Sequence, residues 1–549
     1  MYNQTSDAIW WYLHELGSRV VAESGIAIDR FHVGKIILHS LKNSPEYILQ
    51  IDGSTDGRET SKSVLERSVR CASAFKNMGL QYQDVIVIMA PNHLDLVIPM
   101  YAGLYIGIIV AGVDVGLGVN ELRDTLKCTE PKIIFCENSN VPTIKEALKA
   151  LNITTRIVTF GKKQDDKMSF KELLDKYAGD TTVEQFKPAD FDPTLTIAIL
   201  VPTSGSTGIP KTAALTHKNV FYGFPCILVF NTEFPSPFDK VMVLSPIQWI
   251  SATLQFIMSP IVRYTRMQTS SPLTAHHVYS LINKYKPEFT IMSPTFMTTV
   301  FKSGDRDKCD FSSLKFIIVG GSAVSKQLLE EVKEVIPNCH LQIGYGLTES
   351  SGLVCNPSYS PFGSLGTPLN SVQFKLVDVN TDEVINEPNV SGELRIKGPA
   401  VFMGYYNDAQ MTAAAFDEDG WLKTGDIHYR DENFNYYFVD RHKLLLKYKS
   451  YQVSPTEIES VIIEHPGVLD VAVTGIPDDE LGDLVVAFVV PIKGCTVTAQ
   501  EIKDLVKASL SDPKQLRGGV IFLPEMPTTS TSKIDRTKLK KMALSLNRE

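Results

Sequence analysis

Up to about residue 440, short apolar runs alternate with segments in which apolar residues recur at helical spacing. The runs that predict buried strands are Val85–Met89, Lys132–Cys136, Ile157–Thr159, Leu195–Val201 and Phe316–Val319. Between Lys326 and Val335 the apolar spacing predicts a helix. Strands that alternate with helices in this way are typical of a largely parallel α/β fold.

One long apolar stretch admits two interpretations. Leu96–Val113 is uncharged and long enough to cross a bilayer. It contains Pro99 and three glycines, however, and no basic cluster flanks it. We therefore favour a buried helix that runs into a buried strand, rather than an integral membrane segment.

The later part of the chain follows other patterns. Between Val372 and Gly398, strands alternate with polar turns, which indicates an antiparallel β unit. Further on, Ser454-Pro455-Thr456-Glu457 predicts a helix start with a Ser N-cap, Pro at the first position and a Glu that closes a capping box. The pattern recurs at Thr498-Ala499-Gln500-Glu501. The strands expected around these helices are Val468–Thr474, Val485–Val490 and Val520–Leu523.

These patterns predict two domains. Residues 1–440 form a large N-terminal domain with two parallel-type α/β subdomains and an antiparallel β-barrel-like subdomain. Residues 441–549 form a small α+β domain. Hydrophobic residues make up 44% and charged residues 21% of the 549 residues, as in ordinary globular proteins.

Charge and cysteine usage narrow the function classes. The chain has 54 basic and 62 acidic residues, a net charge of −8, and no basic stretch that could follow a phosphate backbone. Nucleic-acid binding is therefore disfavoured. The eight cysteines are scattered without a Cys-x-x-Cys pair, which favours reduced thiols over disulfides or a zinc site.

Residues 202–211 (Pro-Thr-Ser-Gly-Ser-Thr-Gly-Ile-Pro-Lys) have the composition of an anion-binding loop. Two glycines let the backbone approach a ligand closely, three hydroxyls offer donors, and Lys211 adds a point charge. This is not a Walker A loop, because Pro210 before Lys211 has no N–H to donate. A plain surface turn is the alternative, but the apolar strand before the loop and the lysine after it favour polyphosphate binding.

Five further segments occur in a fixed order after this loop. They are Ile343–Ser350, Gly392–Arg395 with Gly404–Tyr406, Gly420–Asp426, Val439–Lys443 and Ser532–Arg536. Together with the loop, they resemble the motifs of the adenylate-forming (ANL) superfamily over about residues 30–545. Within that superfamily the chain most resembles beetle luciferases and the luciferase-like acyl-CoA synthetases of insects.

The resemblance implies an ATP-dependent reaction in two steps. A carboxylate attacks the α-phosphate of ATP, pyrophosphate leaves, and the thiol of CoA then displaces AMP from the acyl-adenylate. The implied ligands are ATP, Mg²⁺, CoA and a small apolar or fatty acid. Since two anions must meet in the first step, the site needs positioned cations and donors.

The resemblance also implies residue roles. The β- and γ-phosphates would be held by Ser204, Gly205, Ser206, Thr207, Gly208 and Lys211. The adenine would pack on Tyr345 and Gly346, with Gly320, Gly321, Ser322 and Ala323 on its other side. Glu349 would bind Mg²⁺, Thr348 would donate to the α-phosphate, and Asp426 and Arg441 would bind the ribose. Lys533 would bridge the carboxylate and the α-phosphate. The domain of residues 441–549 would be a mobile lid with its hinge at Lys443, and Lys447 would face the adenylate after the lid rotates.

Several positions depart from the family pattern. Thr212 and Ser450 replace glycines, the second of them on the path of the CoA arm. In the expected acyl pocket, Trp249 occupies the gating aromatic position, and the segment from Ser245 to Ser251 lacks the histidines of luciferases. Gly223 stands about where luciferases have an arginine.

These departures favour a carboxylate–CoA ligase. A luciferase (luciferin 4-monooxygenase) that oxidises luciferyl-adenylate with O₂, and an inactive nucleotide- or acyl-binding homologue, remain the alternatives. The N-terminus lacks the features of a signal peptide and the last residues do not form a Ser-Lys-Leu ending. We therefore expect a cytoplasmic or peroxisomal protein, and the missing ending slightly favours the cytoplasm. The sequence predicts neither the length of the acid nor the oligomeric state.

Overall fold

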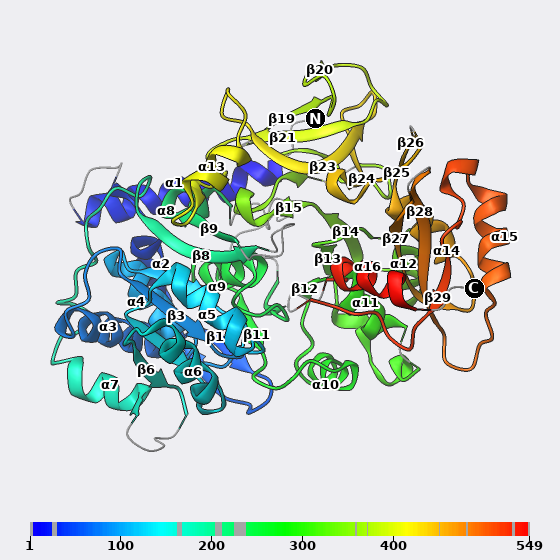
Figure 1. Ribbon diagram of the computed structural model, residues 1–549. Coiled ribbons are helices and arrows are strands. Elements are labelled where there is room, and N and C mark those ends of the chain that lie inside the picture. The colour runs from blue at the N-terminus through cyan, green and yellow to red at the C-terminus, as the bar shows by residue number, and fades with distance from the viewer. Residues whose placement is uncertain are drawn as a thin grey trace.

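The structure is a computed structural model of the chain. It describes residues 4–24, 30–161, 167–203, 211–223, 238–302, 304–324, 326–356, 360–369, 372–449, 451–478, 481–529 and 533–546. Two large sheets covered by helices form the body, and an antiparallel sheet lies above them in Figure 1. The C-terminal elements lie at the right-hand side of that figure. The predicted α/β class, with parallel sheets in the body, is confirmed.

The first large sheet has seven strands in the order β14-β13-β12-β10-β11-β1-β2, and only β1 and β2 pair antiparallel. Its strands are β1 (Ile48–Asp52), β2 (Arg58–Thr60), β10 (Lys240–Met242), β11 (Thr265–Gln268), β12 (Phe289–Met292), β13 (Phe316–Gly320) and β14 (His340–Gly344). The helices that follow along this part of the chain are α9 (Ile250–Val262), α10 (Ala275–Tyr285), α11 (Pro294–Phe301) and α12 (Lys326–Val335). The predicted helix Lys326–Val335 is confirmed at both ends.

The second large sheet has eight strands in the order β22-β9-β8-β4-β3-β5-β6-β7. Its strands are β3 (Val85–Met89), β4 (Ile109–Gly112), β5 (Ile133–Cys136), β6 (Arg156–Thr159), β7 (Met168–Ser169), β8 (Ile197–Thr203), β9 (Lys211–Thr216) and β22 (Gly404–Tyr405). The N-terminal half contributes the helices α1 (Gln4–Ser24), α2 (Val33–Asn43), α3 (Ser61–Asn77), α4 (Val97–Ile106), α5 (Val119–Thr129), α6 (Val141–Leu151), α7 (Phe170–Tyr177) and α8 (His217–Gly223). The strand predicted from Leu195 starts at Ile197, because a turn closed by the Asp192 carbonyl holds Leu195 in solvent.

The long apolar stretch is a buried helix followed by a buried strand, as predicted. All residues of α4 and β4 are buried, and Gly107 ends the helix with a φ of 73°. A glycine suits this position because a left-handed backbone costs it little. Among the described residues, no helix is both long and apolar enough to cross a membrane.

An antiparallel sheet with the order β20-β19-β21-β23-β24 follows the body, as the alternating pattern predicts. Its strands are β19 (Gln373–Val377), β20 (Val384–Ile385), β21 (Gly392–Lys397), β23 (Leu422–Arg430) and β24 (Tyr436–Arg441). The short elements beside it are β15 (Gly346–Leu347), β16 (Gly352–Leu353), β17 (Cys355–Asn356), β18 (Thr367–Pro368), α13 (Ala409–Ala415) and the 3₁₀ turn η6 (Thr348–Ser350). Between Glu393 and Arg395 the pairing of β21 with β23 shifts register, so Thr424–Asp426 bulge out opposite Leu394.

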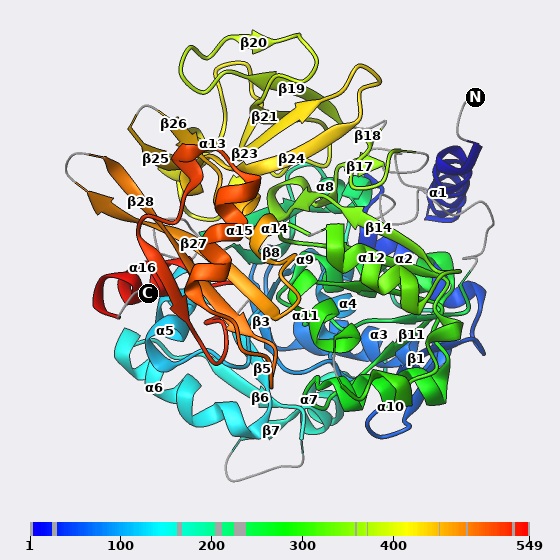
Figure 2. The ribbon, with the colours of Figure 1, turned by 90° about the vertical axis from the view of Figure 1, so that its right-hand side faces the viewer.

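The C-terminal residues build a sheet of their own, with two hydrophobic clusters that contain only residues from Leu446 onward. Its strands are β25 (Leu446–Tyr448), β26 (Tyr451–Val453), β27 (Val468–Asp478), β28 (Gly482–Pro491) and β29 (Gly519–Phe522). The accompanying helices are α14 (Pro455–Ile462), α15 (Ala499–Ser509) and α16 (Arg536–Ser545), and the whole unit faces the viewer in Figure 2.

The two predicted helix starts of this unit differ in detail. Thr498 and Glu501 form the complete capping box that the sequence predicts. Ser454 caps α14 by accepting from the Glu457 amide, but the reciprocal bond expected from the Glu457 side chain is not part of this cap. That carboxylate pairs with Lys514 instead, so an ion pair with a residue 57 positions further along the chain replaces half of the predicted box. The seven cysteines in the described parts are free thiols, in line with the prediction.

Candidate active site

Charged and aromatic groups from five parts of the chain meet where the antiparallel sheet, the body and the C-terminal unit adjoin. Tyr345 follows β14, Glu349 lies in η6, Asp426 and Arg441 lie on β23 and β24, Lys211 starts β9, and Lys533 precedes α16. A hydrogen bond, an ion pair and electrostatic interactions link Tyr345, Glu349, Asp426, Arg441 and Lys533, and Tyr405 lies between Glu349 and Lys211. The structure therefore brings together six of the residues predicted to bind the nucleotide and its metal ion.

Asp426 is the most buried carboxylate of this cluster, with 2% of its surface exposed. Its Oδ2 accepts a hydrogen bond of 2.8 Å from the Tyr345 hydroxyl. Its Oδ1 lies 3.0 Å from Arg441 Nε as an ion pair, yet has no hydrogen-bond partner among the described residues. Burial raises the pKa of Asp426, while Arg441, Tyr345 and Lys533 oppose that rise. One oxygen is thus fixed and the other is left to accept from a ligand hydroxyl, which fits the ribose role expected from the sequence.

The ring of Tyr345 is held from the side. Its centroid lies 4.7 Å from that of His428, edge to face. His428 is fully buried, and burial lowers its pKa to about 3, so it is neutral at physiological pH. Burial and the neighbouring Asp426 raise the pKa of Tyr345, so the phenol stays protonated and donates to that carboxylate. Stacking of adenine on this ring remains a prediction.

Glycines let the backbone of the expected adenine site pack closely. A Cβ placed on Gly320 would lie 2.2 Å from the Gly344 carbonyl oxygen, and one on Gly346 would lie 2.1 Å from the Gly352 carbonyl oxygen. Gly321 has a φ of 93° and, like Ser322 and Ala323, is exposed. The residues after β13 therefore offer an open backbone edge beside Tyr345, and their contact with adenine stays a prediction.

The phosphate loop joins the antiparallel pair β8 and β9, in which Thr203 lies opposite Lys211. Ser204, Gly205, Ser206, Thr207 and Gly208 lie outside the described residues, so their roles stay predictions. Lys211 itself is half-buried, with its ammonium 4.9 Å from the centroid of the Tyr405 ring. The Tyr405 hydroxyl donates a 2.9 Å hydrogen bond to Glu349 Oε1.

Tyr405 therefore connects the phosphate-loop lysine with the predicted metal ligand, and sequence reasoning missed it as a site residue. The signal was present in Gly404-Tyr405-Tyr406, which was assigned only as a family motif. The position follows from the pairing of β22 with β9, which sets Tyr405 opposite Ala213, two residues beyond Lys211.

Glu349 is connected through Tyr405 to Lys211, and its carboxylate chemistry suits Mg²⁺. Within the described residues, no group of three or more His, Cys, Asp or Glu side chains could hold a metal ion. Mg²⁺ commonly uses one or two carboxylates and completes its shell with water and phosphate oxygens, so a single carboxylate is enough. Thr348 lies directly before it, half-buried at the start of η6.

Lys533 reaches this cluster from the C-terminal unit. The surrounding protein lowers its pKa by desolvation and Arg441 adds to that effect, whereas Asp426 and Glu349 raise it. The Lys533 side chain is exposed, and its ammonium interacts electrostatically with all three charged groups. Its backbone is anchored, because Thr529 N donates to the Lys533 carbonyl over 2.7 Å and Arg536 binds both oxygens of Glu459 at 2.7 and 3.0 Å.

The predicted hinge and thioester lysines are both exposed. Lys443 is exposed in the 3₁₀ turn η7 (His442–Leu444), and Lys447 is exposed on β25. Just before the hinge, Asp440 is 1% exposed and accepts from the Ser454 hydroxyl and, over 3.1 Å, from the Thr456 amide. One carboxylate therefore joins β24 to the start of α14. Ser450 lies outside the described residues.

The expected acyl region surrounds the start of α9. Trp249 immediately precedes the helix, and its buried Nε1 has no hydrogen-bond partner within the described ranges. Ser251 donates to the Ser245 hydroxyl over 3.1 Å. A Cβ on Gly223 would lie 2.1 Å from the Ser351 carbonyl oxygen. The space that an arginine would need at position 223 is therefore taken by the backbone at Ser351.

Comparison with known proteins shows the family to which the chain belongs. The AMP-binding enzyme family matches residues 38–406, and the AMP-binding enzyme C-terminal domain matches residues 457–533. The chain is 34% identical to luciferin 4-monooxygenase of Photuris pensylvanica, over 87% of this chain and 88% of that protein. It is 29% identical to the probable 4-coumarate–CoA ligase 1 of Dictyostelium discoideum, over 94% and 96% of the two chains.

Among solved structures, an anthranilate CoA ligase in complex with anthranoyl-AMP has the same fold, with a TM-score of 0.86 and 22% sequence identity over 95% of this chain and 98% of that one. The chain belongs to the AMP-binding enzyme family, as the sequence motifs indicate. Its relatives include luciferases as well as acid–CoA ligases. The position of the domain boundary at residues 440 and 441 stays a prediction.

Proposed function

We propose that the protein is an AMP-forming acid–CoA ligase, which activates an apolar or fatty carboxylic acid with ATP and transfers it to CoA. The observation that carries this proposal is the meeting of Lys533 with Asp426 and Glu349. An electrostatic interaction of this lysine with the carboxylates that would bind the ribose and Mg²⁺ supports a role in bridging an acid and the α-phosphate.

In the first step, an oxygen of the substrate carboxylate attacks the α-phosphorus, the bond to the β-phosphate bridging oxygen breaks, and pyrophosphate leaves. Lys533 offsets the repulsion between the two anions, and Lys211 sits where it can balance charge on the departing phosphates. Bound Mg²⁺, held by Glu349, would neutralise phosphate charge. Asp426 fixes the ribose, which limits the motion of the α-phosphate relative to Lys533.

In the second step, the CoA thiol attacks the acyl carbon, the bond between that carbon and the AMP oxygen breaks, and AMP leaves. We place the boundary of the lid after residue 440 and its hinge at Lys443. Rotation about this hinge would withdraw Lys533 and bring Lys447 to the adenylate. Such a step uses one domain to complete two sites in turn.

The experiment that tests the proposal measures pyrophosphate release, CoA consumption and light over a panel of acids that includes luciferin. Pyrophosphate release with thioester formation is expected for at least one apolar acid. Lys533→Ala should lower adenylation by roughly two to three orders of magnitude and leave ATP binding largely intact. Lys540→Ala, which removes an exposed lysine on α16, is the matched control and should be unchanged. Equal adenylation by the Lys533 variant and the control would exclude the bridging role.

A luciferase is the second candidate function, because several similar proteins are luciferin 4-monooxygenases. The close contact of Gly223 with Ser351 supports the ligase instead, since it leaves no room for an arginine there. Light from luciferin without thioester formation would favour the luciferase. No pyrophosphate with any acid would favour an inactive homologue, which the charged cluster argues against.

A further inference from the structure

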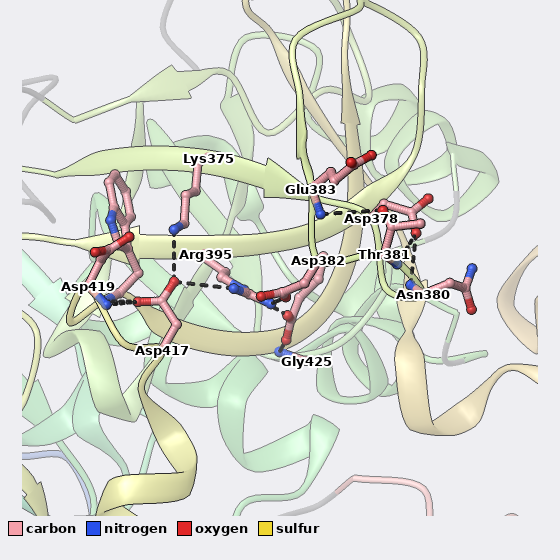
Figure 3. A network of polar contacts seen from close by, with 12 residues as sticks. Lys375, Asp378, Asn380, Thr381, Asp382, Glu383, Arg395, Asp417, Asp419 and Gly425 are labelled. Atoms are coloured by element: carbon pink, nitrogen blue, oxygen red, sulfur yellow. Dashed lines mark hydrogen bonds and ion pairs between the residues drawn. The ribbon is translucent and has the colours of Figure 1, made fainter.

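A buried ion network lies behind the ribose side of the site. Its centre is Arg395 on β21, whose side chain is 7% exposed. Arg395 Nε lies 3.1 Å from Glu393 Oε2, Nη1 lies 3.2 Å from Asp417 Oδ2, and Nη2 pairs with Asp382. Figure 3 shows Asp417 on one side of the guanidinium and Asp382 on the other, with Lys375 also reaching Asp417 at 2.8 Å.

The network touches the site through Glu393. Its second oxygen, Oε1, accepts a 3.1 Å hydrogen bond from the backbone amide of Gly425. Gly425 has a φ of 69° and immediately precedes Asp426. The Thr424 hydroxyl lies on the other side of this turn, where it donates to the Leu394 carbonyl over 2.6 Å.

The turn depends on these side chains because the sheet holds it from one side only, where Asp426 pairs with Arg441 of β24. Thr424–Asp426 form the bulge opposite Leu394, so the regular ladder between β21 and β23 is interrupted at this point. On the β21 side, the position of Asp426 is therefore set by the bonds that Glu393 and Thr424 make at the bulge. Glu393 can make its bond only while its carboxylate stays in place.

Arg395 keeps that carboxylate in place. The side chains of Glu393 and Asp417 are only 12% and 10% exposed, and both point at the same guanidinium. Without the Arg395 cation, Glu393 would lose its charged donor and be repelled by Asp417, whereas Asp417 would keep Lys375 as a partner. Glu393 would then turn toward solvent or take up a proton, and the Gly425 amide would lose its acceptor.

We infer that Arg395 is a positioning residue for nucleotide binding, acting through Glu393 and Gly425 to present Asp426 to the ribose hydroxyls. The inference rests on the proposed function, in which Asp426 binds ribose. Arg395 does not touch the nucleotide itself. Its effect is therefore limited to the part of the binding free energy that depends on the ribose hydroxyls.

The test compares ATP with 2′,3′-dideoxy-ATP, which lacks both hydroxyls. Dissociation constants are measured by calorimetry on the full chain, without the acid. The wild type should bind ATP at least tenfold more tightly than the dideoxy analogue. Arg395→Met should weaken ATP binding about tenfold and leave the affinity for the analogue unchanged, because a shift of about 1 Å in a positioned group commonly costs one to two orders of magnitude. Arg395→Lys should restore part of the preference for ATP.

Asp382→Asn is the matched control, since it weakens an ion pair of Arg395 that has no contact with Gly425. The Asp382 side chain is 72% exposed, and its loss should leave both affinities within twofold of the wild type. If Arg395→Met folds poorly, Glu393→Gln replaces it, as a near-isosteric change that removes the charge held by Arg395. A preference for ATP that survives in both Arg395→Met and Glu393→Gln would overturn the inference. A wild type without any preference for ATP would instead contradict the ribose role of Asp426 in the proposed function.

Discussion

The hydrogen bond from Tyr345 to Asp426 gives the sharpest prediction about nucleotide binding. Tyr345→Phe removes the hydroxyl and keeps the ring beside His428, so the packing at 4.7 Å is preserved. A hydrogen bond to a charged group contributes about 1.5–3 kcal/mol. If this free energy is expressed in ligand binding, the affinity for ATP falls roughly 10- to 150-fold.

The same change predicts a pH dependence with a defined sign. Burial already raises the pKa of Asp426, and the Tyr345 hydroxyl opposes that rise. Without the hydroxyl, the pKa rises further, so the carboxyl becomes protonated at a higher pH and stops accepting from the ribose. The affinity of the variant should therefore fall relative to the wild type as the pH is lowered from 8 toward 5.

The measurement is calorimetry of ATP binding to both proteins across this pH range. Tyr437→Phe serves as the control, because it removes a tyrosine–aspartate hydrogen bond of 3.3 Å, to Asp431, on the same sheet. The control should bind ATP like the wild type. If Tyr345→Phe binds ATP within twofold of the wild type at every pH, the assigned role of this hydrogen bond is wrong.

Two further predictions concern stability. Burial raises the pKa of Asp470 to about 6, so the folded wild type loses stability as the pH rises from about 4 through 6. Asp470→Asn should be more stable at pH 8 by roughly 1–3 kcal/mol and show no advantage near pH 4, as followed by thermal melting; an equal difference at every pH would exclude this origin. Gly223→Ala should lower the melting temperature by several degrees, because its Cβ would lie 2.1 Å from the Ser351 carbonyl oxygen. Gly304→Ala, where nothing lies within 4 Å of the added Cβ, should melt close to the wild type.

Local sequence patterns predicted the start and end of an element correctly where residues of that element alone determine them. The helix Lys326–Val335 ends where its apolar spacing ends, because that spacing also defines the buried face. The start of β8 was placed two residues early, since the apolar Leu195 belongs to a turn formed by an aspartate three residues before it. The missing half of the Glu457 cap has a similar cause, because a lysine 57 positions away competes for that carboxylate.

The candidate site shows the same limit. Motifs located Tyr345 and Asp426 on the sequence, but nothing in either motif indicates that the hydroxyl of one binds the carboxylate of the other, 81 residues away. The sequence identifies Tyr405 and Arg395 only as members of family motifs, without a role for either side chain. Their contacts depend on the register of β22 with β9 and on the bulge between β21 and β23, and register is a property of the folded sheet.

The buried Asp440 links two events that are separate in the sequence. It holds the first turn of α14 and also accepts from the backbone amide of Arg441 over 2.7 Å. Rotation of the proposed lid about Lys443 that carries α14 away would break the hydrogen bonds from Ser454 and Thr456 to Asp440. The buried Asp440 carboxylate would then lose these donors directly beside Arg441, the arginine proposed to bind the ribose. In the lid rotation that we propose, nucleotide occupancy and lid orientation would be thermodynamically linked, and each would bias the other by the same free energy. Release of AMP and the return of the lid would then be energetically coupled.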